Sequence, residues 1–147
     1  MEKDVIISIN GLHNAGNEED NVEMIAPGNY YNKNGKHYII YSEISGDNGD
    51  INKNTIKISN NVIDIIRKGS SNVHMVFEEG KKHTSYYNTP FGNMLIGLSA
   101  KHIEVSDKSD EMNINIDYSI EVNYEHLSDC IMNINIKSKE GANITLM

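Results

Sequence analysis

The clearest pattern of hydrophobic and polar positions lies between Glu111 and Val122, where the two kinds of residue alternate at every step. One side of this segment holds only apolar or aromatic side chains: Met112, Ile114, Ile116, Tyr118, Ile120 and Val122. A period of two predicts a long β-strand with one face in water and the other in a core. No segment shows a helical period of comparable quality, so the pattern predicts a protein that is nearly all β.

The same alternation, read along the whole chain, predicts about ten strands joined by mostly short connections. They are Val5–Leu12, Val22–Tyr31, Lys36–Ser45, Thr55–Ser59, Val62–Lys68, Val73–Glu78, Lys82–Thr89, Asn93–Val105, Glu111–Asn123 and Leu127–Lys137. Asn34-Gly35 is the strongest hairpin signal, because both residues tolerate the positive φ angles of a type I′ turn. Asn60-Asn61 is a second two-residue turn, and the polar segments 14–21 and 46–54 are predicted to be loops.

Consecutive hairpins favour an up-and-down meander, which closes into a barrel without crossover connections and leaves no exposed strand edge. We therefore expect a single closed antiparallel β-barrel of about 8–10 strands, formed as one domain over residues 1–147. Five side chains in particular should lie inside it: Ile114, Ile116, Tyr118, Ile134 and Ile136. Cys130 shares the apolar phase of its strand and should be buried as a small hydrophobic residue.

Charge and composition narrow the classes of function. The formal net charge of −8 and the isoelectric point near 5.1 disfavour general nucleic-acid binding, because phosphate backbones are repelled. No apolar run approaches the roughly 18 residues of a membrane-span candidate, and the N-terminus lacks a secretory pattern. We expect a cytoplasmic protein that does not associate with membranes. The six histidines and the one cysteine lack metal-ligand spacing, so no metal or other cofactor is predicted.

A series of short motifs supports the barrel independently. In order, they are Gly28-Asn29-Tyr30-Tyr31, Tyr38-Ile39-Ile40-Tyr41-Ser42-Glu43, Thr55-Ile56-Lys57-Ile58, Arg67-Lys68-Gly69, Phe77-Glu78-Glu79-Gly80 and Tyr87-Asn88-Thr89-Pro90-Phe91-Gly92. Together they resemble the YwiB-like family of small bacterial proteins, a domain-of-unknown-function group. The resemblance implies a calycin-like (lipocalin-like) β-barrel from Val5 to Lys137. It implies no known activity and supplies no catalytic residues.

Two charged residues within predicted strands are the main candidates for function. Arg67 shares its phase with Ile63 and Ile65 and should point into the barrel, whereas Lys57 should point outward. A buried arginine needs a partner, since an unpaired buried charge costs several kcal/mol or more. Glu43 is the obvious partner.

The leading hypothesis is a non-enzymatic barrel that binds a small molecule, with Arg67 holding an anionic group through its planar fork and Glu43 orienting it. Tyr38, Tyr41 and Tyr87 would supply stacking surface and hydroxyl groups. A structural ion pair that fixes strand register is the alternative for Arg67 and Glu43.

Two further functions stay open. One is an enzyme in which Glu43 or His83 acts as general base beside Arg67. The other is a homo-oligomeric interaction module, most simply a homodimer. It is suggested by Ile131, which interrupts a polar phase, and by the mixed Ile6/Leu12 face of the first strand.

Overall fold

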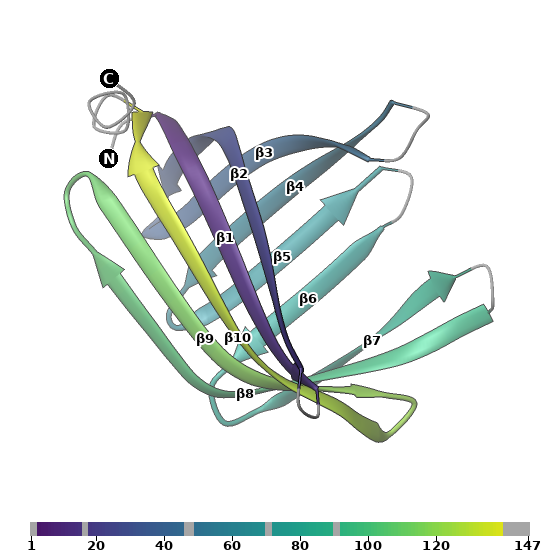
Figure 1. Ribbon diagram of the computed structural model, residues 1–147. Coiled ribbons are helices and arrows are strands. Elements are labelled where there is room, and N and C mark those ends of the chain that lie inside the picture. The colour runs from purple at the N-terminus through teal and green to yellow at the C-terminus, as the bar shows by residue number, and fades with distance from the viewer. Residues whose placement is uncertain (1–2, 16–17, 46–48, 70–71, 90–91, 140–147) are drawn as a thin grey trace.

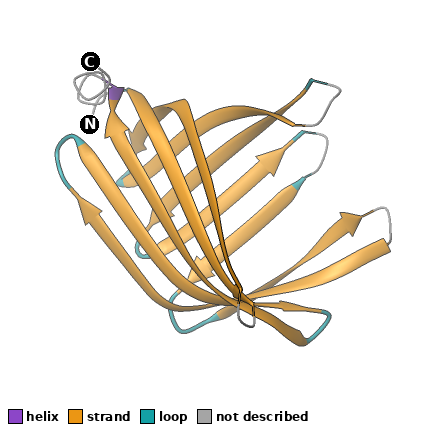
Figure 2. Ribbon diagram, viewed as in Figure 1, coloured by secondary structure: helices purple, strands orange, loops and turns teal. Residues whose placement is uncertain are grey.

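Ten strands make up almost all of the described chain, as the computed structural model shows in Figures 1 and 2. It describes residues 3–15, 18–45, 49–69, 72–89 and 92–139. The strands are β1 (Asp4–Ala15), β2 (Glu18–Lys33), β3 (Lys36–Ser45), β4 (Asp50–Ser59), β5 (Val62–Lys68), β6 (Val73–Glu78), β7 (Lys82–Thr89), β8 (Gly92–Asp107), β9 (Glu111–Val122) and β10 (Glu125–Ser138). The prediction of an all-β chain is confirmed.

All ten strands belong to one sheet in the order β6-β5-β4-β3-β2-β1-β10-β9-β8-β7. Each strand pairs antiparallel with its sequence neighbours, except across the β6–β7 connection, and the β1–β10 ladder joins the two ends of the chain. The sheet curls into a nearly closed barrel whose seam lies between β6 and β7 (Figure 1). The barrel expected from the alternating pattern is therefore confirmed.

Two predicted loops are shorter than expected. β1 extends to Ala15 and β2 begins at Glu18, so the hairpin continues through most of the predicted loop 14–21, with His13 opposite Asp20. β4 begins at Asp50, within the predicted loop 46–54. Backbone pairing needs no apolar side chain, which is why the polar composition of these segments misled the prediction. The two hairpin turns are confirmed, because Asn34, Gly35 and Asn60-Asn61 all have positive φ.

The core occupies the middle of the barrel. Its fully buried side chains come from all around the sheet and include Ile7, Ile39, Ile56, Ile63, Phe77, Met112, Ile114, Ile116, Ile134 and Ile136. The five side chains expected inside are indeed buried, and Tyr118 packs edge-on against Phe77 with ring centroids 4.8 Å apart. Cys130 is buried as predicted. These side chains fill the centre, so a bound molecule has to be sought toward an end.

One end of the interior is polar. Asn52 and Asn54 are only 2% and 1% exposed and alternate with outward residues of β4, in phase with Ile56 and Ile58. Arg67 lies in the same cross-strand row as Asn54. In Figure 1 the C-terminal ends of β3, β5 and β7 reach this side of the molecule. We call this end, defined by Glu43, Asn52, Asn54 and Arg67, the mouth.

Candidate functional site

An ion pair bridged by a buried amide forms the centre of the mouth. Nη2 of Arg67 lies 2.8 Å from Oε1 of Glu43. Asn54 joins the two side chains: its Nδ2 donates to Glu43 Oε1 at 3.1 Å, and its Oδ1 accepts from Arg67 Nε at 3.2 Å. The predicted partnership of Arg67 with Glu43 is confirmed as a contact. Asn54 fixes both partners from the strand between them.

Strand register explains why these residues meet. Tyr41 on β3 is opposite Asn54 on β4, and Asn54 is opposite Arg67 on β5. Directly opposite residues of an antiparallel pair point to the same face, so all three face the interior. Glu43 lies two residues beyond Tyr41 on the same face and reaches the guanidinium diagonally.

Tyr41 lies in the same electrostatic environment. Its side chain is buried, and burial raises the pKa of its hydroxyl to about 12, with a further increase from Glu43 and an opposing effect from Arg67. The phenol is therefore neutral at physiological pH and available as a hydrogen-bond donor. The expectation that Tyr41 accompanies Arg67 agrees with this placement, while its role in binding stays a prediction.

The other two tyrosines lie elsewhere. Tyr38 was expected among the lining residues, but it is three residues from Tyr41 and therefore points to the opposite, outer face. There it lies beside Lys57, whose Nζ is 6.0 Å from the ring centroid, which also confirms that Lys57 points outward. Tyr87 packs against the core, and its buried hydroxyl has no hydrogen-bond partner among the described residues. Burial raises the pKa of Tyr87.

A cleft opens beside Arg67, where the end of the β5–β6 hairpin faces β7. It has a volume of about 490 Å³ and is lined by Ile66, Arg67, Lys68, Asn72, Val73, His74, Ser85 and Tyr86. The Ser85 hydroxyl donates to the backbone oxygen of His74 at 3.2 Å, which joins β7 to β6 at the floor of the seam. The Arg67 side chain is 41% exposed, so its guanidinium is both anchored and open to solvent.

His83 does not share this site. Its Nε2 lies 3.0 Å from Glu78, and the resulting hydrogen bond lowers the pKa of Glu78. Glu78 is opposite Val62 on β5, five residues before Arg67, a separation of roughly 17 Å at about 3.3 Å per residue. The expectation that His83 could act as a base beside Arg67 is therefore wrong, because the two residues lie near opposite ends of β5.

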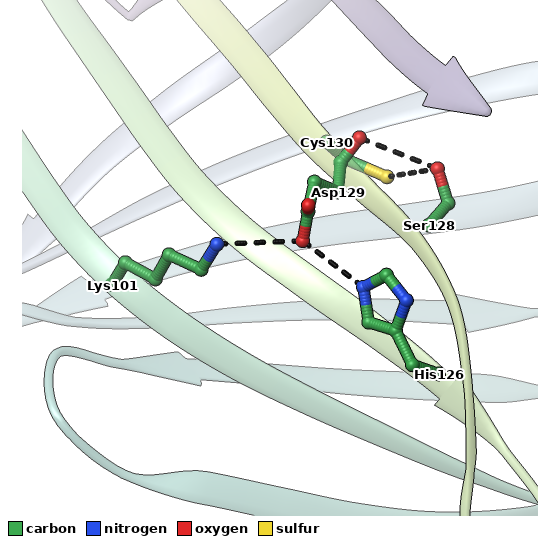
Figure 3. Close-up of polar contacts among 5 residues, drawn as sticks. All are labelled: Lys101, His126, Ser128, Asp129 and Cys130. Carbon is green, nitrogen blue, oxygen red and sulfur yellow. Dashed lines mark hydrogen bonds and ion pairs between the residues drawn. The ribbon is translucent and has the colours of Figure 1, made fainter. Parts of the chain in front are cut away.

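Cys130 and the nearest histidine of its own strand also point to different partners. Figure 3 shows the Cys130 thiol directed to the Ser128 hydroxyl, 3.8 Å away, while His126 contacts Asp129 at 3.1 Å. Asp129 also contacts Lys101, and these contacts, led by the hydrogen bond from His126, lower its pKa. Asp129 is exposed whereas Ser128 and Cys130 are buried, as strand alternation requires. The Ser128 hydroxyl also donates to the backbone oxygen of Asp129 at 3.3 Å, but the Asp129 carboxylate and the His126 imidazole do not contact the thiol, so these residues form no relay from carboxylate through imidazole to thiol.

Asn54 is the residue that the sequence reasoning missed. The Gly, Asp and Asn content of residues 46–54 predicts a loop, which hides the strand to which Asn54 belongs. The phase of Asn52 and Asn54 with Ile56 and Ile58 was a usable signal. Tyr86 was also missed as a neighbour of Arg67, because only the curvature of the sheet brings β7 beside β5 and β6. Lys68 follows Arg67 in β5 and His74 is paired with β5 from β6, so both lie near Arg67 through local pairing.

The described residues contain neither a metal-binding cluster nor a membrane-spanning helix. No group of three or more His, Cys, Asp or Glu side chains among them is placed to hold a metal ion. Within the same residues, no helix has the length and apolar character of a membrane span.

Comparisons with known proteins agree with this fold. The chain is similar to the uncharacterised β-barrel protein YwiB of Bacillus subtilis (strain 168), with 29% identity over 118 residues that cover 79% of this chain and 81% of the relative. The crystal structure of the YwiB protein from Bacillus subtilis matches it with a TM-score of 0.78 and 22% identity over 92% of each chain, a likeness of fold. The family described as a domain of unknown function (DUF1934) matches residues 7–134. The chain therefore belongs to this DUF1934 family of YwiB-like β-barrel proteins.

Proposed function

We propose that this barrel binds a small anionic molecule at its mouth, with Arg67 as the group that holds the anion. The observation that carries the proposal is the state of the Arg67 guanidinium, which two partners fix while 41% of the side chain remains exposed. The filled centre of the barrel directs the ligand to the cleft rather than to the interior. The proposal keeps the cytoplasmic location expected from the sequence.

The remaining hydrogen-bonding capacity of Arg67 suits an anion. A guanidinium carries five N–H groups in a planar fork. Glu43 engages Nη2 and Asn54 engages Nε, and no other described residue forms a hydrogen bond or ion pair with Arg67. Nη1 is therefore free to donate to a carboxylate or phosphate oxygen. Because the side chain is already held in place, binding costs less conformational entropy than it would for a mobile arginine.

The charge of the cleft favours the same class of ligand. Its lining includes Arg67, Lys68 and His74 and no acidic residue. His74 is paired with Asp64 at 2.9 Å. A positively charged cleft on a chain whose net charge is −8 raises the local concentration of anions. The apolar side chains of Ile66, Val73 and Tyr86 add contact area for a carbon skeleton.

Benzoate is a suitable first probe because it combines a carboxylate with an apolar ring. In ¹H–¹⁵N spectra, increasing benzoate should shift the Arg67 Nε–H and the Asn54 side-chain amide. Occupancy at about 100 times the dissociation constant should stabilise the fold by roughly 2.7 kcal/mol. Replacing Arg67→Gln should weaken binding at least about tenfold, or roughly 1.4 kcal/mol.

The controls separate binding from folding. Arg67→Lys keeps the charge without the planar fork and should bind with intermediate affinity, while Lys33→Gln removes a distant exposed charge and should leave binding unchanged. Dispersed amide spectra establish that each variant is folded. Benzoate affinity that does not respond to Arg67→Gln, or shifts confined to another surface, would contradict the proposal.

The homodimer expected as an alternative remains a prediction, favoured by the 47% exposure of Ile131 on the outer face.

A further inference from the structure

We infer that the mouth is built for a dianionic group, such as the phosphate of a small phosphate monoester, with Lys68 and Lys53 joining Arg67 around it. This inference rests on the proposed function and narrows its ligand class. Its basis is a pair of lysines that the sheet places directly opposite each other at the mouth.

Lys53 on β4 and Lys68 on β5 are cross-strand partners in register. Residues so paired have Cβ atoms roughly 4.5–5.5 Å apart, and like charges at that position are destabilising. Both lysines are exposed, and neither forms an ion pair with any described residue. Among the described residues, the two neighbouring ammonium groups are therefore not neutralised by an ion pair, although the chain is acidic.

The lysine pair adjoins the Arg67 cleft. Lys68 is the last residue of β5 and follows Arg67 directly, so the two side chains leave opposite faces of the sheet. Both nevertheless line the same cleft, which means that the cleft extends over the end of the strand. A group seated at this rim is approached by the guanidinium from the interior face and by the Lys68 ammonium from the outer face. Lys53 is the cross-strand neighbour of Lys68 there and borders a separate cleft that also includes Asp4.

The charge balance at the rim exceeds what a carboxylate neutralises. Glu43 is already engaged by Arg67 and Asn54, and Asp64 is engaged by His74. Lys53 and Lys68 therefore contribute two positive charges that no described contact offsets. A phosphate monoester carries close to two negative charges at neutral pH and three acceptor oxygens, so it matches both the charge and the number of donors.

A matched pair of probes tests the inference on the full chain. Phenyl phosphate and benzoate share the ring and differ in charge, and at about pH 7.5 the phosphate is largely dianionic. We expect phenyl phosphate to bind at least about tenfold more tightly in ¹H–¹⁵N titrations. The Lys53→Gln/Lys68→Gln variant should remove that preference and weaken benzoate binding by a smaller factor, because Lys68 also lines the cleft while the direct donor to the carboxylate is Arg67.

The chain offers a matched control pair. Lys33 and Lys36 are also cross-strand partners, but on the β2–β3 hairpin. The Lys33→Gln/Lys36→Gln variant changes the net charge by the same amount and should preserve the preference for phenyl phosphate. Equal losses in the two double variants would show unspecific attraction and overturn the inference.

The remaining outcomes separate this inference from the proposed function. If both probes bind with equal affinity and both depend on Arg67, the proposed anion site holds and the dianion preference is wrong. If neither probe shifts a resonance of the mouth at a concentration of about 10 mM, the dissociation constants are too high for specific binding. The anion site and the dianion preference are then both wrong. Phosphate binding that depends on the lysines but not on Arg67 would support the lysine pair and contradict the role of Arg67.

Discussion

At the scale of single residues, Asn54 organises the mouth. Its amide uses both ends, donating to Glu43 and accepting from Arg67, while the residue itself is almost completely buried. An amide at this position satisfies one acceptor and one donor without adding charge to a site that already holds an ion pair. Glu43 and Arg67 are partly exposed, at 27% and 41% of their side chains, so solvent screens their attraction and the buried amide matters more for stability.

We expect Asn54→Ala to lower the free energy of unfolding by about 1–3 kcal/mol, because Glu43 and Arg67 each lose a hydrogen bond in a partly buried place. Urea denaturation monitored by circular dichroism measures the change. Asn32→Ala, at an exposed position of β2, is the control and should cost less than about 0.5 kcal/mol. A cost for Asn54→Ala no larger than that of the control would mean that the amide does not hold the ion pair.

At the scale of elements, the hairpin turns set the register of the sheet. Asn60 and Asn61 have φ angles of 47° and 66°, and Asn123 and Tyr124 have 51° and 70°. Asparagine adopts the left-handed region with little strain, whereas a tyrosine there is uncommon. The β9–β10 turn therefore carries strain that the β4–β5 turn avoids, although Tyr124 is 78% exposed and contributes little packing.

Replacing Tyr124→Gly should stabilise the protein by about 0.5–1 kcal/mol, since relief of left-handed strain exceeds the added flexibility of glycine in the unfolded chain. Asn61→Gly is the matched comparison and should change stability by less, because Asn already tolerates this conformation. Both are measured as shifts in the denaturation midpoint at unchanged slope. A loss of stability in Tyr124→Gly would show that the aromatic ring contributes more than its exposure indicates.

At the scale of the whole molecule, the seam between β6 and β7 decides how the barrel closes. β6 and β7 are not paired by a ladder of backbone hydrogen bonds, and contacts of side chains and of the β6–β7 turn hold this region together instead. The Gly80 amide donates to the Ala100 oxygen at 2.9 Å, and the Glu79 carboxylate accepts from the Ile103 amide at 2.9 Å. His102 lies between Glu79 and Glu104, 2.9 Å from each. The β6–β7 turn is thus fastened to the bulge in β8.

This fastening should depend on pH. The hydrogen bond to Glu104, followed by the charges of Glu104 and Glu79, raises the pKa of His102 above its usual value near 6.5. Because the pKa of His102 is higher in the folded than in the unfolded protein, its protonated form stabilises the fold at pH values below the unfolded pKa. This stabilisation is lost as the pH rises through the folded pKa. His102→Gln should therefore reduce stability at pH values below about 6.5 and matter progressively less above the folded pKa.

Hydrogen exchange locates the effect. In the wild-type protein, the Gly80 and Ile103 amides should exchange faster as pH rises through the His102 transition, beyond the intrinsic pH dependence. His102→Gln should abolish that additional change, whereas His126→Gln, which alters an exposed histidine beside Asp129, should retain it. Identical behaviour of the two variants would show that His102 does not fasten the seam.

The amino-acid sequence by itself determined most of the strands, the inward face of each and Glu43 as the expected partner of Arg67. Alternation is a local property, because successive side chains of any strand point to opposite faces, and the phases of Ile63 and Ile39 already assigned Arg67 and Glu43 to the interior. The odd spacing of Tyr38 from Tyr41 likewise places Tyr38 on the outer face. Only the tertiary structure decided that Asn54 bridges the ion pair and that β7 closes the cleft beside Lys68. Those features depend on which residues become opposite one another and on the curvature of the sheet. Register and curvature are set by packing across the whole barrel, and no single segment contains that information.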